Sequence, residues 1–277
     1  MKKIAITGST GLIGARIIEL LQNDFEFIPL SSEKLDITDT DAVTKTLDSI
    51  SYDIFLHLAA YTNVDGAETN KEATYTLNVK GTENVLNETI KKDAQFIYIS
   101  TGFVFDGTSP PYFEDSIPNP IGYYGQTKFE GEELVKDNGM IVRIEYPYGH
   151  SPAAKKDFAR TIKSLLEQGK TIKGIENSLM TPTYIDDIAE GLKYLMNNFS
   201  SEIYHLVGCA TISPFNAAKT IAKTFGYDET LVQPTSYEEY FAGKAKRPQF
   251  ADVRSKKNTF VTMKSFEEGV DCLDTTS

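Results

Sequence analysis

The opening stretch of the chain, residues 4–21, constrains the fold more than any other. Residues 4–6 are an apolar run that predicts a buried strand, and apolar residues at helical spacing follow over 13–21. Between them lie glycines at a spacing of three: Gly8, Gly11 and Gly14. A strand that turns sharply into a helix leaves unpaired backbone N–H groups at the helix start, and these groups, with the helix dipole, favour a phosphate. The stretch therefore predicts a strand–turn–helix unit that binds the pyrophosphate of a dinucleotide.

The spacing of these glycines is GxxGxxG, which differs from the commonest dinucleotide fingerprint, GxGxxG. Each glycine still has a physical role in the prediction. Gly8 permits a tight turn, Gly11 lets a pyrophosphate approach the backbone, and Gly14 lets the helix pack closely on the strand. A glycine turn of purely structural purpose is the alternative interpretation. The cofactor contacts predicted in this turn are Gly8, Thr10, Gly11, Leu12, Ile13 and Gly14.

Length and composition exclude several classes of function. The chain has 277 residues, enough for one large domain or for a core domain with a small lobe. Its net charge of -11 disfavours a nucleic-acid partner, because surface binding of phosphates needs a basic face. No apolar run approaches the roughly 18–20 residues that span a bilayer, and no signal peptide is evident. The sequence predicts a soluble, cytoplasmic protein without a membrane partner, and it leaves a homodimer open.

Two cysteines, at 209 and 272, give neither a disulfide framework nor a zinc pattern, so no metal site is predicted. Over residues 1–150, apolar runs that predict strands alternate with segments of helical spacing. This alternation predicts a Rossmann-type, doubly wound parallel sheet that binds a dinucleotide. Residues 151–277 are less regular, and we interpret them as a smaller, mixed α/β substrate-binding lobe, with some segments returning to the first domain.

In an open parallel sheet, ligands bind at the carboxyl ends of the strands. The second predicted strand ends at Ser31, where an acidic residue would bind the ribose diol of NAD. Because a serine can donate to a 2′-phosphate, the sequence favours NADP(H), with NAD(H) as the alternative since Glu33 is close. Asp36 either caps a turn or accepts from the adenine amine, and Asn78 suits a structural hydrogen bond or a water relay. The small pair Ala59 and Ala60 lets a cofactor lie against a strand end.

Tyr124 and Lys128 are four residues apart at the start of a predicted helix, so their Cβ atoms lie ~5–6 Å apart on one face. A phenol with a pKa of about 10 is a poor acid–base group at neutral pH, but a nearby ammonium, and a nicotinamide ring that is positively charged when oxidised, lower that pKa. Thr101 ends the preceding strand and can hydrogen-bond the same substrate oxygen. This trio suits ketone reduction, in which a nicotinamide gives a hydride to carbon and Tyr124 protonates oxygen. A surface Tyr–Lys pair is the alternative interpretation.

Several strings of residues resemble the extended short-chain dehydrogenases/reductases and, within them, the dTDP-4-dehydrorhamnose reductases. They lie at 8–14, 35–39, 59–68, 78–82, 100–107, 124–128, 182–187 and 247–248. The resemblance implies a Thr101/Tyr124/Lys128 catalytic trio, a nucleotide-sugar substrate and a nicotinamide cofactor. In that family a 4-keto-6-deoxy sugar is reduced to give dTDP-L-rhamnose. The cofactor contacts outside the glycine turn would be Ser31, Asp36, Ile37, Ala59, Ala60, Tyr61, Asn78, Tyr124 and Lys128.

The chain departs from that family where the substrate would lie. The family's Ser-Thr-Asp-Tyr-Val-Phe reads Ser-Thr-Gly-Phe-Val-Phe at 100–105, which removes an acid and a phenol hydroxyl. The family's tryptophan before Val-Tyr-Gly is replaced by Tyr146. Arg247 is the candidate for the substrate pyrophosphate, because a guanidinium makes bidentate phosphate contacts, unless it is a solvated loop arginine. The predicted substrate contacts are Gly102, Phe103, Val104, Tyr146, Thr183 and Arg247.

Two other functions stay open from the sequence. A nucleotide-sugar epimerase or dehydratase with bound NAD would use the same trio, although dehydratases carry Asp-Glu where this chain has Gly102 and Phe103. A non-catalytic NADP-binding subunit, resembling the regulatory subunit of methionine adenosyltransferase, would keep the fold without the reaction. Among the remaining polar residues, we interpret His57 as a core histidine and Glu132–Glu133 as solubilising charge. The basic residues Lys155, Lys156 and Arg160 are interpreted as a solvated face.

Overall fold

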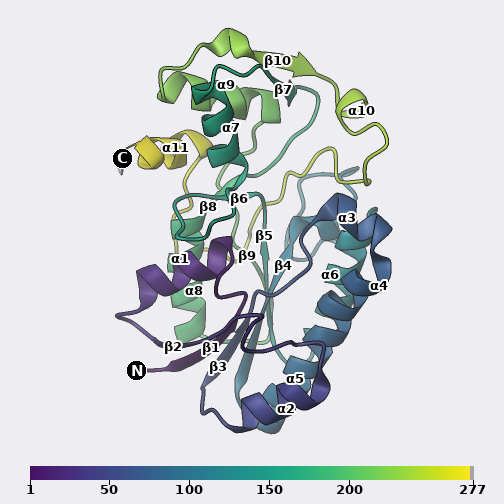
Figure 1. Ribbon diagram of the computed structural model, residues 1–277, viewed down its shortest axis with the longest axis vertical. Coiled ribbons are helices and arrows are strands. Elements are labelled where there is room, and N and C mark those ends of the chain that lie inside the picture. The colour runs from purple at the N-terminus through teal and green to yellow at the C-terminus, as the bar shows by residue number, and fades with distance from the viewer. Residues whose placement is uncertain (275–277) are drawn as a thin grey trace.

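The computed structural model describes residues 1–274, and at its centre is a six-stranded sheet in the order β2-β1-β3-β4-β5-β9 (Figure 1). The strands are β1 (Lys3–Thr7), β2 (Glu26–Leu30), β3 (Ile54–His57), β4 (Gln95–Thr101), β5 (Met140–Ile144) and β9 (Ile203–His205). Every neighbouring pair is parallel. From β1 the chain moves outward to β2 and then returns across β1 to β3, which is the doubly wound topology that the alternation predicts. The Rossmann-type fold is therefore confirmed.

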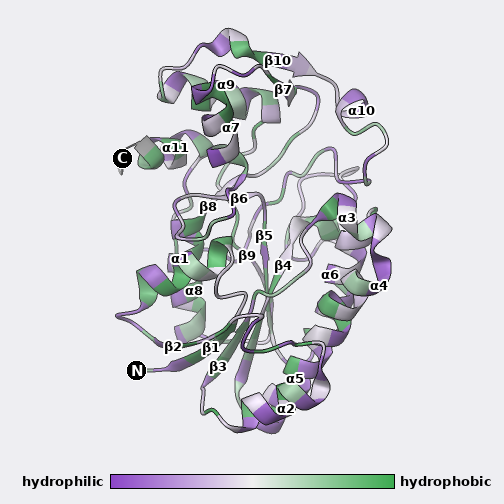
Figure 2. Ribbon diagram, viewed as in Figure 1, coloured by the Kyte–Doolittle hydropathy of each residue, from purple (hydrophilic) through white to green (hydrophobic). Residues whose placement is uncertain are grey.

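Helices cover both faces of this sheet (Figure 1). One face carries α1 (Leu12–Leu21) and α8 (Ile185–Asn197), and the other carries α2 (Thr40–Asp48), α5 (Gly81–Lys91) and α6 (Tyr123–Val135). Successive side chains of a strand point to opposite faces. Accordingly, Ile4 and Ile6 belong to the apolar cluster on the α1 side, whereas Ala5 belongs to the cluster on the α2 side. Figure 2 shows the mixed hydrophobic and hydrophilic surfaces expected of helices that bury one face.

The segment between β3 and α5 is a run of short helical elements. These are α3 (Val64–Thr69), α4 (Lys71–Tyr75) and the π-helical turn η1 (Thr76–Lys80). A second short turn, the 3₁₀-helix η2 (Gly102–Val104), follows β4 directly. Such turns at strand ends bend the chain and fix where the following side chains lie. Both contain predicted contacts: Asn78 for the cofactor lies in η1, and η2 consists of predicted substrate contacts.

A smaller lobe stands above the sheet in Figure 1. Its parallel strand pair is β7 with β10, and its apolar cluster includes Leu166, Ile221 and Phe266. Its elements are α7 (Phe158–Glu167), β7 (Ile172–Ile175), α9 (Pro214–Thr224), η3 (Glu229–Leu231), β10 (Val232–Thr235), α10 (Tyr237–Tyr240) and α11 (Phe266–Asp274). A third sheet, in which β6 (Pro147–Tyr148) pairs with β8 (Thr183–Tyr184), lies between the two parts.

The predicted lobe at 151–277 thus contributes the strand β9 to the main sheet and the helix α8 to the layer that covers it. Its residues 275–277 lie outside the described residues. Whether residue 150 separates two folding domains stays a prediction. Among the described residues, no helix combines the length and apolarity needed to cross a bilayer. None of their His, Cys, Asp and Glu side chains gather in threes or more to hold a metal ion.

The interpretation of Glu132 as solubilising charge is wrong. Glu132 on α6 accepts two hydrogen bonds from Arg143 on β5, at 2.9 Å from Nε and 2.6 Å from Nη2. The two side chains are 2% and 1% exposed, so the ion pair is buried and fastens α6 to the sheet. Glu133 does pair with Lys136 at the surface, as expected of solubilising charge. His57 is a core histidine, as predicted: it is fully buried and its ring contacts the hydroxyls of Thr7 and Thr82.

Candidate active site

The turn between β1 and α1 has the shape of an anion cradle. Gly8 has a φ of +64°, a backbone conformation that residues with a side chain rarely adopt. Its carbonyl accepts a hydrogen bond from Gly11 N at 2.9 Å. A Cβ on Gly14 would lie 3.0 Å from the carbonyl carbon of Gly8, so the start of α1 packs directly on the turn. Because the N-cap of α1 is Gly11, no side chain accepts from the first N–H groups of the helix. These donors remain available to a phosphate.

A cavity of about 720 Å³ opens over this turn. The predicted cofactor contacts that line it are Gly8, Thr10, Gly11, Leu12, Ile13, Gly14, Asp36, Ile37, Ala59 and Ala60. The predicted catalytic residues line the same cavity: Thr101, Tyr124 and Lys128. Segments that are far apart in the sequence therefore meet in one space, which runs from the carboxyl end of β2 to that of β5.

The three remaining predicted cofactor contacts are not among the described residues that line the cavity. Ser32 lines it in place of Ser31, and Thr62 in place of Tyr61. Asn78 lies in the buried turn η1, where its Oδ1 accepts from Tyr61 N at 2.7 Å and its Nδ2 donates to Thr127 Oγ1 at 3.0 Å. Of the two interpretations of Asn78, the structure therefore contains the structural hydrogen bond, which ties the end of β3 to α6.

Asp36 combines features of both interpretations that the sequence left open. Its Oδ1 accepts from the backbone N of Thr38 at 2.9 Å and from the hydroxyl of Thr38 at 2.7 Å, so it closes a local turn. These two hydrogen bonds lower the pKa of Asp36. The residue also lines the cavity near the end of β2, where an adenosine would lie.

Tyr124 lies in the first turn of α6, and its phenol lines the cavity together with Thr101 at the end of β4, whose hydroxyl is near enough to influence the pKa of Tyr124. Lys128 lies one turn later and is 3% exposed. Its Nζ donates to the carbonyl of Ile99 at 2.8 Å and stands 3.9 Å from the centre of the Tyr98 ring. The three side chains are thus held from two elements, and the i, i+4 spacing on α6 points both functional groups into the cavity.

Residues 1–274 match the family described as RmlD substrate binding domain. The chain belongs to this family. Among the relatives of this RmlD family chain is the spore coat polysaccharide biosynthesis protein SpsK of Bacillus subtilis (strain 168). It is 30% identical over 256 residues, which cover 91% of this chain and 88% of SpsK.

Two further matches carry the name of a reductase. The dTDP-4-dehydrorhamnose reductase of Aggregatibacter actinomycetemcomitans is 29% identical over 245 residues, 84% of this chain and 81% of the relative. The crystal structure of dTDP-4-dehydrorhamnose reductase from Bacillus anthracis str. Ames in complex with NADP superposes with a TM-score of 0.92 at 30% identity. That match covers 100% of the RmlD family chain and 99% of the other.

The pKa of Tyr124 is raised from its ordinary value, whereas the sequence predicted a lowered one. Burial is the main cause, the Glu145 carboxylate adds to it, and the nearby Thr101 hydroxyl opposes both. Burial also lowers the pKa of Lys128 to about 7, against the pull of Glu132. The ammonium of Lys128 is directed at a backbone carbonyl, so burial of the phenol outweighs its influence. At neutral pH Tyr124 therefore holds its proton, as a proton donor must.

The predicted substrate contacts divide into two groups. Phe103 and Tyr146 line the cavity, and the Phe103 ring lies 5.8 Å from that of Tyr124 and 5.9 Å from that of Tyr146 between centres. The others are not among the described residues that line it: Gly102, Val104, Thr183 and Arg247.

Local bonding explains where two of these residues lie. Thr183 is fully buried, donates to the carbonyl of Thr181 and accepts from Gly208 N, so it holds the start of α8. Arg247 forms an ion pair with Asp65 after β3, and its guanidinium lies 4.2 Å from the centre of the Phe241 ring. Its side chain is only 13% exposed, so Arg247 is not a solvated loop residue. Its contact with a substrate pyrophosphate stays a prediction, and a bound phosphate would share the guanidinium with Asp65.

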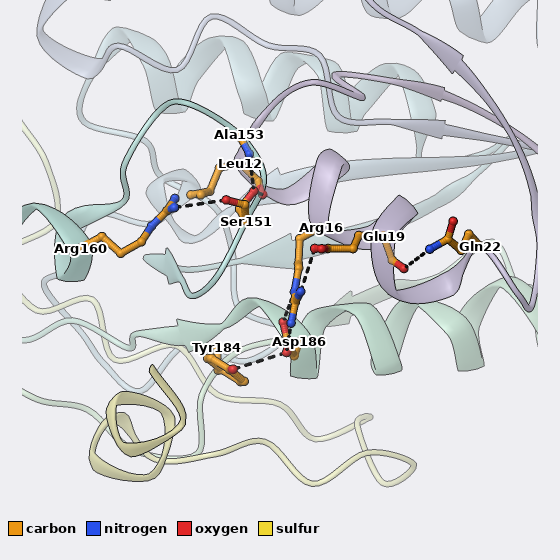
Figure 3. Close-up of polar contacts among 9 residues, drawn as sticks. All are labelled: Leu12, Arg16, Glu19, Gln22, Ser151, Ala153, Arg160, Tyr184 and Asp186. Carbon is orange, nitrogen blue, oxygen red and sulfur yellow. Dashed lines mark hydrogen bonds and ion pairs between the residues drawn. The ribbon is translucent and has the colours of Figure 1, made fainter. Parts of the chain in front are cut away.

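The lobe reaches the glycine turn directly, which the sequence did not predict (Figure 3). The hydroxyl of Ser151 donates to the carbonyl of Leu12 at 2.7 Å, and Arg160 on α7 donates to the carbonyl of Ser151 at 3.3 Å. On the next turn of α1, Arg16 pairs with Asp186 at the start of α8 through contacts of 2.7 and 2.8 Å. The helix that would hold the cofactor phosphates is thus fastened at two points to the following half of the chain.

The interpretation of the basic cluster as a solvated face needs correction at Arg160. That side chain is only 21% exposed and is paired with the buried carboxylate of Asp157 at 2.6 Å. Lys155 and Lys156 are exposed, as expected, but Lys155 also lines the cavity, where its Nζ lies 3.3 Å from the hydroxyl of Thr62. Such contacts connect residues more than 90 positions apart and leave no pattern in the sequence.

Proposed function

We propose that this chain catalyses the NADPH-dependent reduction of the 4-keto group of a nucleotide-linked 6-deoxy sugar, as a dTDP-4-dehydrorhamnose reductase that gives dTDP-L-rhamnose. The observation that carries the proposal is the meeting of Thr101, Tyr124 and Lys128 in the cavity over the glycine turn. Two of the similar proteins named above are reductases of this kind, and one of them has NADP bound. The match of 1–274 to one family supports the same reading for the whole chain.

The residues around the cavity fit a dinucleotide. The glycine turn has room for a pyrophosphate because Gly8, Gly11 and Gly14 carry no side chain, and the N-terminus of α1 offers N–H donors. Ala59 and Ala60 leave space along the end of β3. At the end of β2, Ser32 lines the cavity and offers a hydroxyl to a 2′-phosphate. We therefore propose NADP(H) as the preferred cofactor and NAD(H) as the weaker one.

When bound, the reduced nicotinamide would supply the hydride to the carbonyl carbon of the sugar. The phenol of Tyr124 would donate its proton to the ketone oxygen, and the hydroxyl of Thr101 would hydrogen-bond the same oxygen. Lys128 is fixed on the carbonyl of Ile99, one helical turn from Tyr124, where its ammonium can stabilise the phenolate that proton transfer leaves. Phe103 and Tyr146 offer apolar ring faces on which a sugar can stack.

Replacement of Gly11 by valine is expected to weaken NADPH binding by roughly 10- to 100-fold, about 1.4–2.8 kcal/mol. A Cβ on Gly11 would lie 3.1 Å from the carbonyl oxygen of Gly8, and the rest of the side chain would fill the place of the pyrophosphate. The dissociation constant is measured by isothermal titration calorimetry, and Gly11→Ala tests whether the loss grows with side-chain size. Unchanged affinity in a valine variant with the wild-type melting temperature would contradict a cofactor site at this turn.

The function is tested by NADPH oxidation with a panel of nucleotide-linked 4-keto-6-deoxy sugars, with NADH in parallel. We expect turnover with the dTDP-linked ketone and a higher kcat/KM with NADPH than with NADH. Tightly retained NAD⁺ in the purified protein would favour the epimerase or dehydratase alternative. No oxidation with any keto sugar would favour the non-catalytic subunit. Cytoplasmic localisation and a homodimer stay predictions, the second of which sedimentation analysis can test.

A further inference from the structure

Glu145 is a buried carboxyl that no step of the proposed reaction uses. It follows β5 directly and is 1% exposed. Among the described residues, neither of its carboxyl oxygens accepts a hydrogen bond of good geometry, although the backbone N–H of Gly102 is near enough to favour the charged form. A buried polar group without a partner lowers stability, and a buried charge without one lowers it more. The nearest arginine in sequence, Arg143, is already paired with Glu132, so it does not balance Glu145.

The carboxyl of Glu145 fills the space that a side chain on residue 102 would take. A Cβ on Gly102 would lie 2.8 Å from the carboxyl carbon of Glu145 and 2.9 Å from a methyl of Val253, inside van der Waals contact with both. Gly102 does not have a positive φ, so its backbone does not require glycine. Lack of space is the remaining reason for a glycine at position 102. The carboxyl of Glu145, at the end of β5, and a side chain on residue 102, at the end of β4, would occupy the same volume.

This shared space adjoins the catalytic residues. Gly102 directly follows Thr101, and the ring of Phe103 after it contacts those of Tyr124 and Tyr146. Burial is the main cause of the raised pKa values of Tyr124 and Tyr146, and an ionised Glu145 adds to both, whereas the Arg247 guanidinium lowers the pKa of Tyr146. Burial raises the pKa of Glu145 itself to about 8, and the N–H of Gly102 opposes this shift. Glu145 is therefore neutral at neutral pH.

We propose that Glu145 is a positioning residue of this active site. Its carboxyl group occupies the space beside Gly102, directly after the catalytic Thr101, and its charge state sets how readily Tyr124 gives up a proton. As a neutral acid it leaves Tyr124 able to protonate the ketone oxygen. As a carboxylate it would add a like charge beside the developing phenolate and hold the proton on Tyr124. The catalytic part of the inference rests on the proposed function.

The first experiment moves the carboxyl group from residue 145 to residue 102. Gly102→Asp alone places two carboxyl groups in one buried space, so we expect the melting temperature to fall by roughly 5–10 °C. Glu145→Ala alone should lower kcat/KM by about tenfold, the loss expected of a supporting residue. The double variant, Gly102→Asp with Glu145→Ala, should recover most of both losses. If it is no more stable than Gly102→Asp, the two positions share no space and the inference falls. If it regains stability but not activity, the carboxyl only fills volume and the positioning role is overturned.

The second experiment uses pH. Glu145→Gln has the shape of the neutral acid but no titrating proton, so it is the reference against which the pH dependence of the wild type is compared. As pH rises from about 7 to about 9, wild-type kcat/KM should fall about tenfold relative to that of Glu145→Gln, because only the wild type ionises at residue 145. Lys128 titrates in both proteins, so the ratio cancels its contribution. Parallel pH profiles would contradict the inference.

A stability measurement separates this inference from the proposed function. A raised folded-state pKa means that the folded protein binds more protons than the unfolded chain, so stability is lost as pH rises through about 8. Wild-type stability should therefore decline between about pH 5 and pH 8 relative to Glu145→Gln, in urea unfolding without any substrate. If stability declines in this way but the protein reduces no keto sugar, the proposed function is wrong while the inference that Glu145 is a buried neutral acid stands. If stability does not decline in this way, Glu145 is not a buried neutral acid, whatever the activity of the protein.

Discussion

Replacement of Tyr124 by phenylalanine is expected to lower kcat for keto-sugar reduction by roughly 10²- to 10⁴-fold, the contribution typical of a positioned acid. The change removes only the phenol hydroxyl, and the ring contact with Phe103 at 5.8 Å can remain. NADPH affinity and melting temperature should stay near wild type. Steady-state oxidation of NADPH with the dTDP-linked ketone measures the loss, and fluorescence titration measures cofactor binding.

Tyr123 provides the matched control for this experiment. It is the neighbouring phenol on α6, but it faces Lys71, whose Nζ lies 5.0 Å from the centre of its ring. Tyr123→Phe should leave kcat within about twofold of wild type, because surface substitutions away from the site have small effects. Comparable rates for the two phenylalanine variants would mean that Tyr124 is not the proton donor.

Replacement of Glu132 by glutamine is expected to destabilise the fold by about 3–5 kcal/mol, which is typical when one partner of a buried ion pair is removed. The guanidinium of Arg143 would stay charged and 1% exposed with no carboxylate to balance it. Neighbouring His205 cannot replace the lost acceptor charge, and burial together with Arg143 lowers its pKa to about 4. Urea unfolding followed by circular dichroism measures the loss as a shift of the midpoint.

Two variants control for the loss of charge itself. Glu133→Gln removes the adjacent, exposed carboxylate, and it should leave the urea midpoint unchanged within error. Glu132→Leu combined with Arg143→Met removes both charges, and it should recover most of the stability lost in Glu132→Gln. Equal midpoints for Glu132→Gln and Glu133→Gln would show that the buried pair does not hold α6 on the sheet.

The sheet and the centre of the site could be predicted because their patterns are local in the sequence. A glycine turn between a strand and a helix fixes the ligand edge of β1, and alternation of strands and helices fixes the direction of the others. The spacing of Tyr124 and Lys128 places both on one side of α6 wherever the helix packs. Thr101 could be added because a parallel sheet brings strand ends to the same edge. These inferences depend on short local patterns and on the general topology of parallel sheets.

The other features depend on contacts between distant segments. Ser32 lines the cavity at the end of β2, whereas the sequence predicted Ser31, so the prediction was wrong by one position. Sequence patterns do not locate the end of a strand to within a single residue. The burial of Glu132 depends on Arg143 lying opposite it on β5. Glycine at position 102 has a reason only when Glu145 is seen beside it. The pKa of Tyr124 likewise follows from burial, which an isolated Tyr–Lys motif does not report.

The chain passes between the sheet and the smaller lobe several times, since α8 and β9 return to the sheet between lobe elements. The lobe is therefore not a contiguous module that recombination could move to another enzyme at one splice point. An engineer who wished to change the sugar by grafting a foreign lobe would have to transfer α8 and β9 as well, with the Arg16–Asp186 contact that joins α8 to α1. Single substitutions around the sugar-facing rings offer the more practical route to altered specificity.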